Sequence, residues 1–147
     1  MKEIDQNILD VKIGIIVHAV NCKGVWGAGL AKHIKHQYPK AYNDYITFLK
    51  QFSNSYKALG GVCLTQVGNL CIASVFTQYD TSVASRRTEY SAVMSSMINL
   101  KRHILYNRLD LPLYFPNLMC CGLGGGDWNI VKEIIEESFP KAYICKI

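Results

Sequence analysis

The sequence predicts a three-layer α/β/α sandwich built on a mixed β-sheet, and three observations support this fold class. Strand and helix patterns alternate along most of the chain, which is typical of parallel strands covered by helices on both faces. Two strand patterns in the middle are separated only by Gly68-Asn69, a hairpin-like connection that indicates an antiparallel pair. Half of the 147 residues are hydrophobic, which suffices for one domain over residues 1–147.

The clearest strand in the first half of the chain is the continuous apolar run "IGIIVHAV" (Ile13–Val20), which has the composition of a buried central strand. A short strand is expected before it, over residues 3–8. Helices are expected over residues 28–37 and 41–52. They are separated at Tyr38-Pro39, because the residue before a proline disfavours the helical conformation.

The second half begins with the predicted hairpin, formed by residues 62–67 and 70–76, and a polar loop follows over residues 78–87. A long helix is expected over residues 88–109, because apolar side chains recur there at helical spacing. The remaining expected elements are a strand, a glycine-rich loop, a helix and a last strand, over residues 113–121, 122–127, 128–139 and 142–147.

Composition narrows the setting in which the chain works. The formal net charge of +5 favours anionic partners. No apolar stretch approaches the roughly 20 residues of a membrane-spanning helix, and the N-terminus is too polar for a signal peptide. We therefore expect a soluble, cytoplasmic protein with no membrane partner. The six cysteines show no C-x-x-C spacing, so we expect free thiols, no metal site and no cofactor.

A cluster of basic residues marks the first predicted helix and its end: Lys32, His33, Lys35, His36 and Lys40. Such a cluster either contacts nucleic acid or forms a solvated helix face, and the solvated face is the more common case. The chain carries no known nucleic-acid-binding signature. Nucleic acid is therefore not expected as a partner, and RNA binding is kept only as a third hypothesis.

Two glycine-rich segments each follow a predicted strand and lead into a helix. We call residues 22–31 ("CKGVWGAGLA") the first glycine loop and residues 122–127 ("GLGGGD") the second. Glycines let backbone N–H groups approach a ligand, and a helix N-terminus adds partial positive charge. One such loop is more often an ordinary turn, but two at the edge where α/β sheets bind ligands predict a cradle for a diphosphate.

Asn21, which precedes the first glycine loop, has two alternative roles. Its amide can both donate to and accept from the vicinal hydroxyls of a ribose, or it can stabilise a turn by bonding its own backbone. Trp26 likewise either packs on a sugar face or plugs the space between loop and helix.

The segments "HAVNCKGVWGAGLAKHIKHQYPKAYNDY" and "CCGLGGGDWNIVKEIIEESF" resemble the macrodomain family, whose members bind ADP-ribose. The closer resemblance is to the ADP-ribose 1″-phosphate phosphatases, a branch that overlaps the enzymes removing ADP-ribose from acidic protein side chains. The resemblance covers the whole chain. It implies a single macrodomain over residues 1–147, with ADP-ribose or ADP-ribose 1″-phosphate as partner.

The resemblance also assigns residues to the ligand. Asn7 stands where the family usually has an Asp that bonds the adenine, Ile8 would pack against the adenine, and Asn21 matches the Asn at the distal ribose. The remaining implied ligand contacts are Val20, Trp26, Gly27, Ala28, Gly29, Leu30, Ala31, Gly122, Leu123, Gly124, Gly125, Gly126 and Asp127.

Two positions depart from the family pattern. In the deglycosylating relatives a Lys before the long helix can attack the distal ribose, assisted by an Asp in the second loop. The matching positions here are Arg87 and Gly124. Arginine stays protonated and is a poor nucleophile, so a covalent route through a lysine is not expected.

The expected reaction is hydrolysis at the distal ribose, with release of phosphate from ADP-ribose 1″-phosphate. The alternatives are hydrolysis of an ADP-ribosyl ester, or ADP-ribose binding without catalysis. The catalytic candidates are Asn21 together with Asp127 and His18 as bases. Asp127 is equally suited to cap the next helix, and His18 to be a hydrogen-bonded core residue that strand alternation turns away from Asn21.

Overall fold

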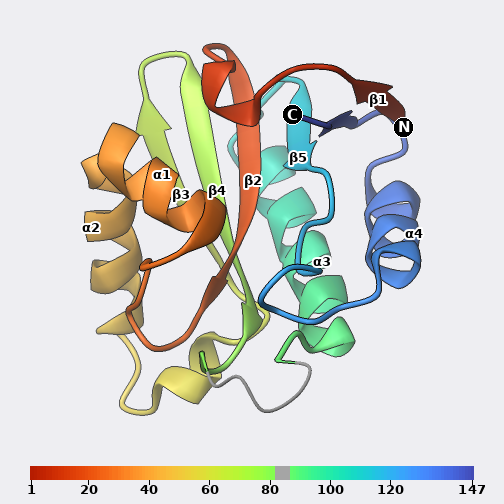
Figure 1. Cartoon of the computed structure of the whole chain (residues 1–147). Helices are drawn as coiled ribbons and strands as arrows, with labels where there is room; N and C mark the ends of the chain where they lie inside the picture. Colours follow the sequence, from red (N-terminus) through yellow and green to blue (C-terminus); the bar gives the residue numbers. More distant parts are fainter. Residues whose placement is uncertain (82–86) are drawn as a thin grey trace.

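The computed structural model describes residues 1–81 and 87–147, which form a six-stranded mixed sheet with helices on both faces (Figure 1). In spatial order the strands are β1 (Lys2–Ile4), β6 (Tyr143–Cys145), β5 (Leu113–Pro116), β2 (Gly14–Asn21), β4 (Leu70–Gln78) and β3 (Val62–Val67). Neighbouring strands are parallel except β3 and β4, which form the predicted antiparallel hairpin. The predicted three-layer α/β/α sandwich is thereby confirmed.

The helices form the two outer layers. Helices α1 (Gly29–Gln37) and α2 (Pro39–Leu49) cover one face of the sheet, and α3 (Tyr90–Tyr106) and α4 (Trp128–Ser138) cover the other (Figure 1). Two 3₁₀ helices, η1 (Ile8–Asp10) and η2 (Ser55–Ala58), lie in the connections. None of the helices in the described part of the chain combines the length and apolarity needed to cross a bilayer.

Strand β2 lies inside the sheet and has a hydrophobic core on each side. Ile16 and Val20 pack beneath α1 and α2, whereas Ile15 and Val17 pack beneath α3 and α4. A strand covered on both faces needs apolar side chains at successive positions, which explains the continuous run seen in the sequence. At Asn21, the last residue of this strand, the chain therefore leaves the sheet between the two helical layers.

The predicted strand over residues 3–8 is wrong beyond Ile4. Asn7 instead caps the 3₁₀ helix η1, because its side-chain oxygen accepts a hydrogen bond from the Leu9 N–H at 3.0 Å. Asparagine offers the backbone such local partners, and these compete with strand pairing. Ile8 is 3% exposed and belongs to the core beneath α1 and α2.

The predicted strand over residues 113–121 is wrong beyond Pro116. Leu118 and Cys120 have left-handed φ angles of 60° and 69°, and the Cys121 N–H closes a turn onto the Leu118 carbonyl at 2.9 Å. The residues after Pro116 were predicted as a strand because several of them are apolar. An apolar residue can equally be buried in a turn, as Met119 is.

Further boundaries differ from the prediction around the long helix. Strand β4 continues to Gln78, and Thr88 forms an isolated antiparallel bridge with it, so α3 begins only at Tyr90. The helix also ends at Tyr106 rather than at residue 109. Residues 82–86 of the predicted loop lie outside the described part of the chain.

Tyr45 of α2 holds the end of β2 in place. Its buried hydroxyl lies 2.7 Å from the backbone oxygen of Asn21 and 3.0 Å from that residue's Oδ1, and it accepts the Gly24 N–H at 2.9 Å. The ring stacks on Phe76 of β4, with centroids 5.4 Å apart. One side chain therefore joins a helix, two strands and the start of the first glycine loop.

We expect Tyr45→Phe to lower the free energy of unfolding by about 1–3 kcal/mol, because it leaves buried hydrogen-bonding groups without a partner. The change is measured by urea unfolding. Tyr106, whose side chain is 88% exposed, provides the control: Tyr106→Phe should leave the midpoint unchanged. Equal midpoints for the two variants would contradict the role given to the Tyr45 hydroxyl.

Candidate functional site

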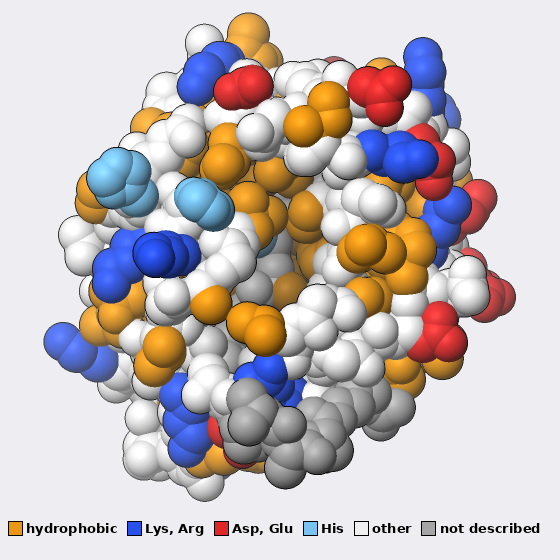
Figure 2. Space-filling model, in the orientation of Figure 1, with side chains coloured by type: hydrophobic (Ala, Val, Ile, Leu, Met, Phe, Trp, Pro, Cys, Tyr) orange, Lys and Arg blue, Asp and Glu red, His pale blue; other side chains and the backbone are white. Residues whose placement is uncertain are grey.

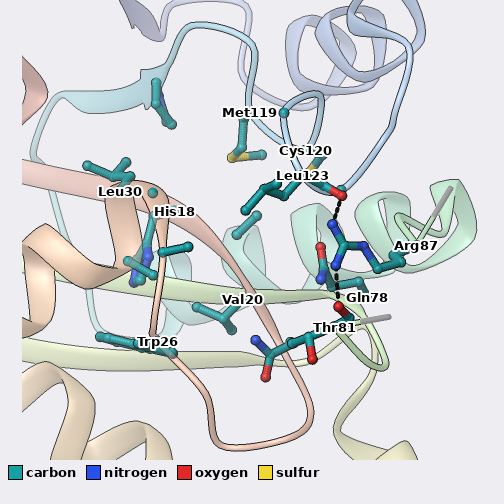
Figure 3. Close-up of a pocket in the computed structure, with 18 of the residues that line it drawn as sticks. His18, Val20, Trp26, Leu30, Gln78, Thr81, Arg87, Met119, Cys120 and Leu123 are labelled. Atoms are coloured by element: carbon teal, nitrogen blue, oxygen red, sulfur yellow. Dashed lines mark hydrogen bonds between the residues drawn. The ribbon is translucent and has the colours of Figure 1, made fainter. Parts of the chain in front are cut away.

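A cavity of about 440 Å³ opens between the two glycine loops, at the carboxyl ends of the central strands (Figures 2 and 3). Figure 2 shows it as a hollow lined largely by apolar surface. The lining residues are 18–21 at the end of β2, 25–31 in the first glycine loop, Gln78, Thr81, Arg87, and 116–120 and 122–124 after β5. Both glycine loops thus line the same cavity.

The first glycine loop leaves donors unused on the cavity. Within residues 1–81 and 87–147, no group accepts a hydrogen bond from the N–H of Trp26, Gly27 or Ala28. Helix α1 begins at Gly29 without a side-chain cap, so its first N–H groups also lack the partner that a helix interior would provide. Consecutive free N–H groups at a helix N-terminus favour an anion.

Asn21 organises the turn that presents these donors. Its Oδ1 accepts the Lys23 N–H at 2.9 Å, and its Nδ2 donates to the Val25 carbonyl at 2.6 Å. The turn-forming role is therefore present in the structure. Asn21 also lines the cavity, and one hydrogen on Nδ2 remains for a ligand.

His18 and Asn21 face the same side of the sheet, so the alternation argument that separated them is wrong. The pairing of β2 with β4 shifts register between Val20 and Asn21, where β4 has an extra residue, Thr77. Asn21 is also the last residue of β2, so strand alternation does not fix the direction of its side chain. The Asn21 side chain contacts Tyr45 of α2, and His18 contacts Trp26, which packs on Tyr45, so both lie on the face covered by α1 and α2.

His18 is a buried, neutral residue at the base of the cavity. Its Nε2 lies 2.8 Å from Ser74 Oγ, and its ring is 4.8 Å from that of Trp26 in an edge-to-face contact. Burial lowers the pKa of His18 to about 3. A group with so low a pKa is a weak base at neutral pH, which supports the role of a core residue over that of a catalytic base.

Trp26 combines both of its predicted roles in part. Its side chain is 2% exposed and its ring lies 4.8 Å from that of Tyr45, which is the packing expected of a plug between loop and helix. The residue also contributes to the cavity wall, beside His18 and Leu30 (Figure 3). Its Nε1 is buried, and no described residue forms a hydrogen bond with it.

The second glycine loop is held against the start of α3. The carbonyl of Gly124 accepts both the Arg87 and the Thr88 N–H groups at 3.0 Å, and Thr88 Oγ1 donates to the Cys120 carbonyl at 3.0 Å. A Cβ on Gly124 would lie 2.5 Å from Thr88 Oγ1, which no side chain tolerates. Position 124 therefore requires glycine, and no carboxylate can occupy it without moving the loop.

Only the first part of the second glycine loop faces the cavity. Gly122, Leu123 and Gly124 line it, and within the described residues nothing accepts from their N–H groups. By contrast, the Gly125 and Gly126 N–H groups donate to Gly122 and Cys120 carbonyls, at 3.1 and 2.8 Å.

Asp127 lies outside the cavity lining. Its carboxylate accepts the Asn129 N–H at 2.9 Å and caps α4, and its own N–H donates to the Tyr90 hydroxyl. Between its two predicted roles, the structure supports the cap. Asn7 and Ile8 are also absent from the lining, since Asn7 caps η1 and Ile8 is in the core.

Arg87 supplies the positive charge of the cavity. Its guanidinium donates to the Leu123 carbonyl through Nη2 and to the Thr81 carbonyl through Nη1 (Figure 3). The described residues that line the cavity include this cation and no carboxylate. The Lys23 Nζ instead lies 2.9 Å from the Tyr79 hydroxyl, and Lys23 is not part of the lining.

Unpaired polar atoms concentrate at this cavity. Four buried side-chain nitrogens and oxygens lack a hydrogen-bond partner within the described residues, and three belong to the lining: His18 Nδ1, Trp26 Nε1 and Arg87 Nε. Leaving such an atom unpaired costs about 1–3 kcal/mol, so most buried polar groups are satisfied. Their clustering indicates a site at which a ligand or water completes the bonding.

Cys22 carries no nucleophilic role in this geometry. It is buried, and burial raises the pKa of its thiol to about 11, which keeps it protonated at neutral pH.

Sequence reasoning missed the end of β5 and the segment after it. Pro116, Asn117, Leu118 and Met119 line the cavity, and Leu118 is 54% exposed. The apolar pattern predicted that these residues continue a strand, so they were not considered as part of the site. Pro116-Asn117 was the available signal, because that pair is typical of a turn.

The chain belongs to the macro domain family, whose model matches residues 17–135. It is similar to the ADP-ribose 1″-phosphate phosphatase of Aspergillus oryzae, with 41% identity over 56 residues that cover 37% of this chain and 28% of the relative. The corresponding Saccharomyces cerevisiae protein is 33% identical over 67 residues, 43% of this chain and 36% of the relative. The similarity thus spans about a third of the length of these relatives.

Solved macrodomains have the same fold. The macrodomain of Mycobacterium tuberculosis DarG matches with a TM-score of 0.79 and 22% identity, over 98% of this chain and 94% of that one. Thermosipho africanus DarTG, solved in complex with ADP-ribose, matches with a TM-score of 0.75 and 20% identity, over 90% of this chain and 38% of that one.

The burial of His18 predicts a specific pH dependence of stability. Its pKa is about 3 in the folded chain against 6.5 unfolded, so its contribution is complete above pH 6.5 and is lost as pH falls from 6.5 toward 3. The slope from this one group approaches about 1.4 kcal/mol per pH unit.

We expect His18→Gln to flatten the slope of unfolding free energy between pH 6.5 and 4 relative to the unchanged chain. His33, exposed on α1, provides the matched control, and His33→Gln should leave the slope unaltered. Denaturant unfolding at each pH measures both. Parallel curves for the His18 variant and the unchanged chain would show that His18 does not remain neutral in the fold.

Proposed function

We propose that this chain hydrolyses ADP-ribose derivatives and that its substrate is ADP-ribose 1″-phosphate, from which it releases phosphate. One observation carries the proposal. Both glycine loops line a single cavity, with unused N–H groups on each and a guanidinium as the cation among the described lining residues. That arrangement suits a ligand with several phosphates and uncharged sugars between them.

The similarity to ADP-ribose 1″-phosphate phosphatases supports the same substrate. In this proposal the diphosphate lies between the N–H groups of Trp26–Ala28 and those of Gly122–Gly124. The distal ribose lies toward Asn21, and its 1″ substituent lies beyond it. Hydrolysis adds water across the bond to that substituent, so the products are ADP-ribose and inorganic phosphate.

The ester-hydrolase alternative has less support from the site. A lysine nucleophile has no counterpart, because the position holds Arg87, and an arginine is a poor nucleophile. A route in which water attacks directly remains open to either substrate. The six cysteines, all free thiols, fit the reducing cytoplasm in which we propose the protein works.

A binding module without catalysis is the second candidate, and one observation favours it. Neither proposed base is well placed, because the pKa of His18 is about 3 and Asp127 caps α4 outside the cavity lining. Such a module would recognise ADP-ribose through the same N–H groups and release nothing.

Phosphate release separates the two functions. The purified chain is incubated with ADP-ribose 1″-phosphate, inorganic phosphate is measured, and ADP-ribose binding is followed by calorimetry. The proposal expects stoichiometric release of phosphate and ADP-ribose. Binding of ADP-ribose with no release would establish the module, and neither binding nor release would remove both functions.

Asn21→Ala should lower phosphate release at least tenfold, because it removes the bonds to the Lys23 N–H and the Val25 carbonyl that shape the first glycine loop. Lys35→Ala, on the exposed face of α1, should change the rate less than twofold. Initial rates at subsaturating substrate measure both. Equal rates in the two variants would place the reaction away from this loop.

A further inference from the structure

We infer that Arg87 recognises the phosphate at the distal end of the ligand and makes the site selective for ADP-ribose 1″-phosphate over ADP-ribose. The inference rests on the proposed function and deepens it, because it names the residue that distinguishes substrate from product. Four observations lead to it: position, preorganisation, charge and an unpaired donor.

The position of Arg87 follows from the sheet. Asn21 at the end of β2 is paired in register with Gln78 of β4, and Gln78 forms a bridge with Thr88, the residue after Arg87. Adjacent strands lie about 4.8 Å apart, so Arg87 begins roughly two strand spacings from Asn21. Asn21, Gln78 and Arg87 all line the one cavity. On this basis we place the guanidinium at the end to which the proposed function assigns the distal ribose.

The guanidinium is held in place before any ligand binds. Its two Nη groups donate to the carbonyls of Leu123 and Thr81, on opposite sides of the group (Figure 3). Its backbone N–H is fixed on the Gly124 carbonyl at 3.0 Å. A donor fixed in this way loses little side-chain entropy when it binds a phosphate.

Among the described lining residues, no carboxylate compensates the charge of Arg87. Gly124 beside Arg87 has no space for a side chain. Because an arginine remains protonated at every physiological pH, its charge is available to an anion and not to a proton-transfer step. The N–H groups of the glycine loops remain for the diphosphate.

Arg87 Nε is a buried donor with no partner within the described residues. Arginine has five N–H donors in a planar fork, and the two carbonyl bonds leave the Nε–H and further Nη hydrogens. The fork matches phosphate oxygens, and charge-assisted bonds of this kind are stronger than those between neutral groups. A phosphate group would pair the donor that the folded chain leaves unpaired.

The test compares two ligands that differ by one phosphate. For the unchanged chain, Arg87→Gln and Arg87→Lys, kcat/KM is measured with ADP-ribose 1″-phosphate, and Kd is measured with ADP-ribose. We expect Arg87→Gln to lower kcat/KM about 30-fold while Kd for ADP-ribose changes less than threefold. For Arg87→Lys, kcat/KM should lie between the values of the unchanged chain and of Arg87→Gln, because lysine keeps the charge and lacks the planar set of N–H donors.

Arg102, exposed on α3, provides the control for a lost positive charge, and Arg102→Gln should change neither quantity more than twofold. Thermal unfolding of each variant reports whether the bonds to Leu123 and Thr81 also support the fold. If Arg87→Gln is unstable, the ligand comparison is made with Arg87→Lys, for which the expected loss is again confined to the phosphorylated ligand.

Equal losses for both ligands, or no loss for either, would overturn the inference. The first result would place Arg87 on the diphosphate or in a purely structural role. A chain that binds ADP-ribose but releases no phosphate would instead overturn the proposed reaction. In that case calorimetry with both ligands still tests Arg87, because the unchanged chain should prefer the phosphorylated ligand about 30-fold and Arg87→Gln should lose that preference.

Discussion

The hydrogen bonds made by the carboxamide of Asn21 are the interactions on which the rest of the site depends. The carboxamide accepts from the Lys23 N–H, donates to the Val25 carbonyl and lies within 3.0 Å of the Tyr45 hydroxyl. These bonds turn the chain out of the central strand and bring it back onto α1. The N–H groups from Trp26 to Ala28 consequently face no protein acceptor in the described residues. The turn uses polar groups of Asn21, Lys23, Gly24 and Val25, and in the described residues it leaves the N–H groups of Trp26, Gly27 and Ala28 without an acceptor.

The second glycine loop reaches a similar result through contacts distant in sequence. Gly124 accepts two N–H groups from the start of α3, and its own Cα lies too close to Thr88 for any side chain. This contact fixes Arg87 beside the loop. The N–H groups of Gly125 and Gly126 donate to carbonyls of Gly122 and Cys120. The loop therefore divides into a part that lines the cavity and a part that supports it.

The division of polar atoms between fold and site gives the cavity its chemical character. Neutral groups, His18 and Trp26, form its base, and within the described residues His18 Nδ1 and Trp26 Nε1 have no hydrogen-bond partner. The guanidinium of Arg87 is at the other end, beside Leu123 and Thr81. Such a site carries a positive charge but presents no group suited to act as a general acid or base. It is therefore better suited to stabilising negative charge than to transferring protons. The same feature explains why binding and hydrolysis remain the two functions to be separated.

The sequence by itself determined the layered fold, the central strand and the two glycine loops, because apolar periodicity and glycine placement are local properties. It also identified Arg87 and Gly124 as unusual positions. Only the tertiary structure decided which loop residues reach the cavity, since the caps made by Asn7 and Asp127 and the turn after Pro116 depend on local hydrogen bonds that pattern alone does not reveal. The shared face of His18 and Asn21 likewise required the register shift against β4, which arises from pairing between strands distant in sequence.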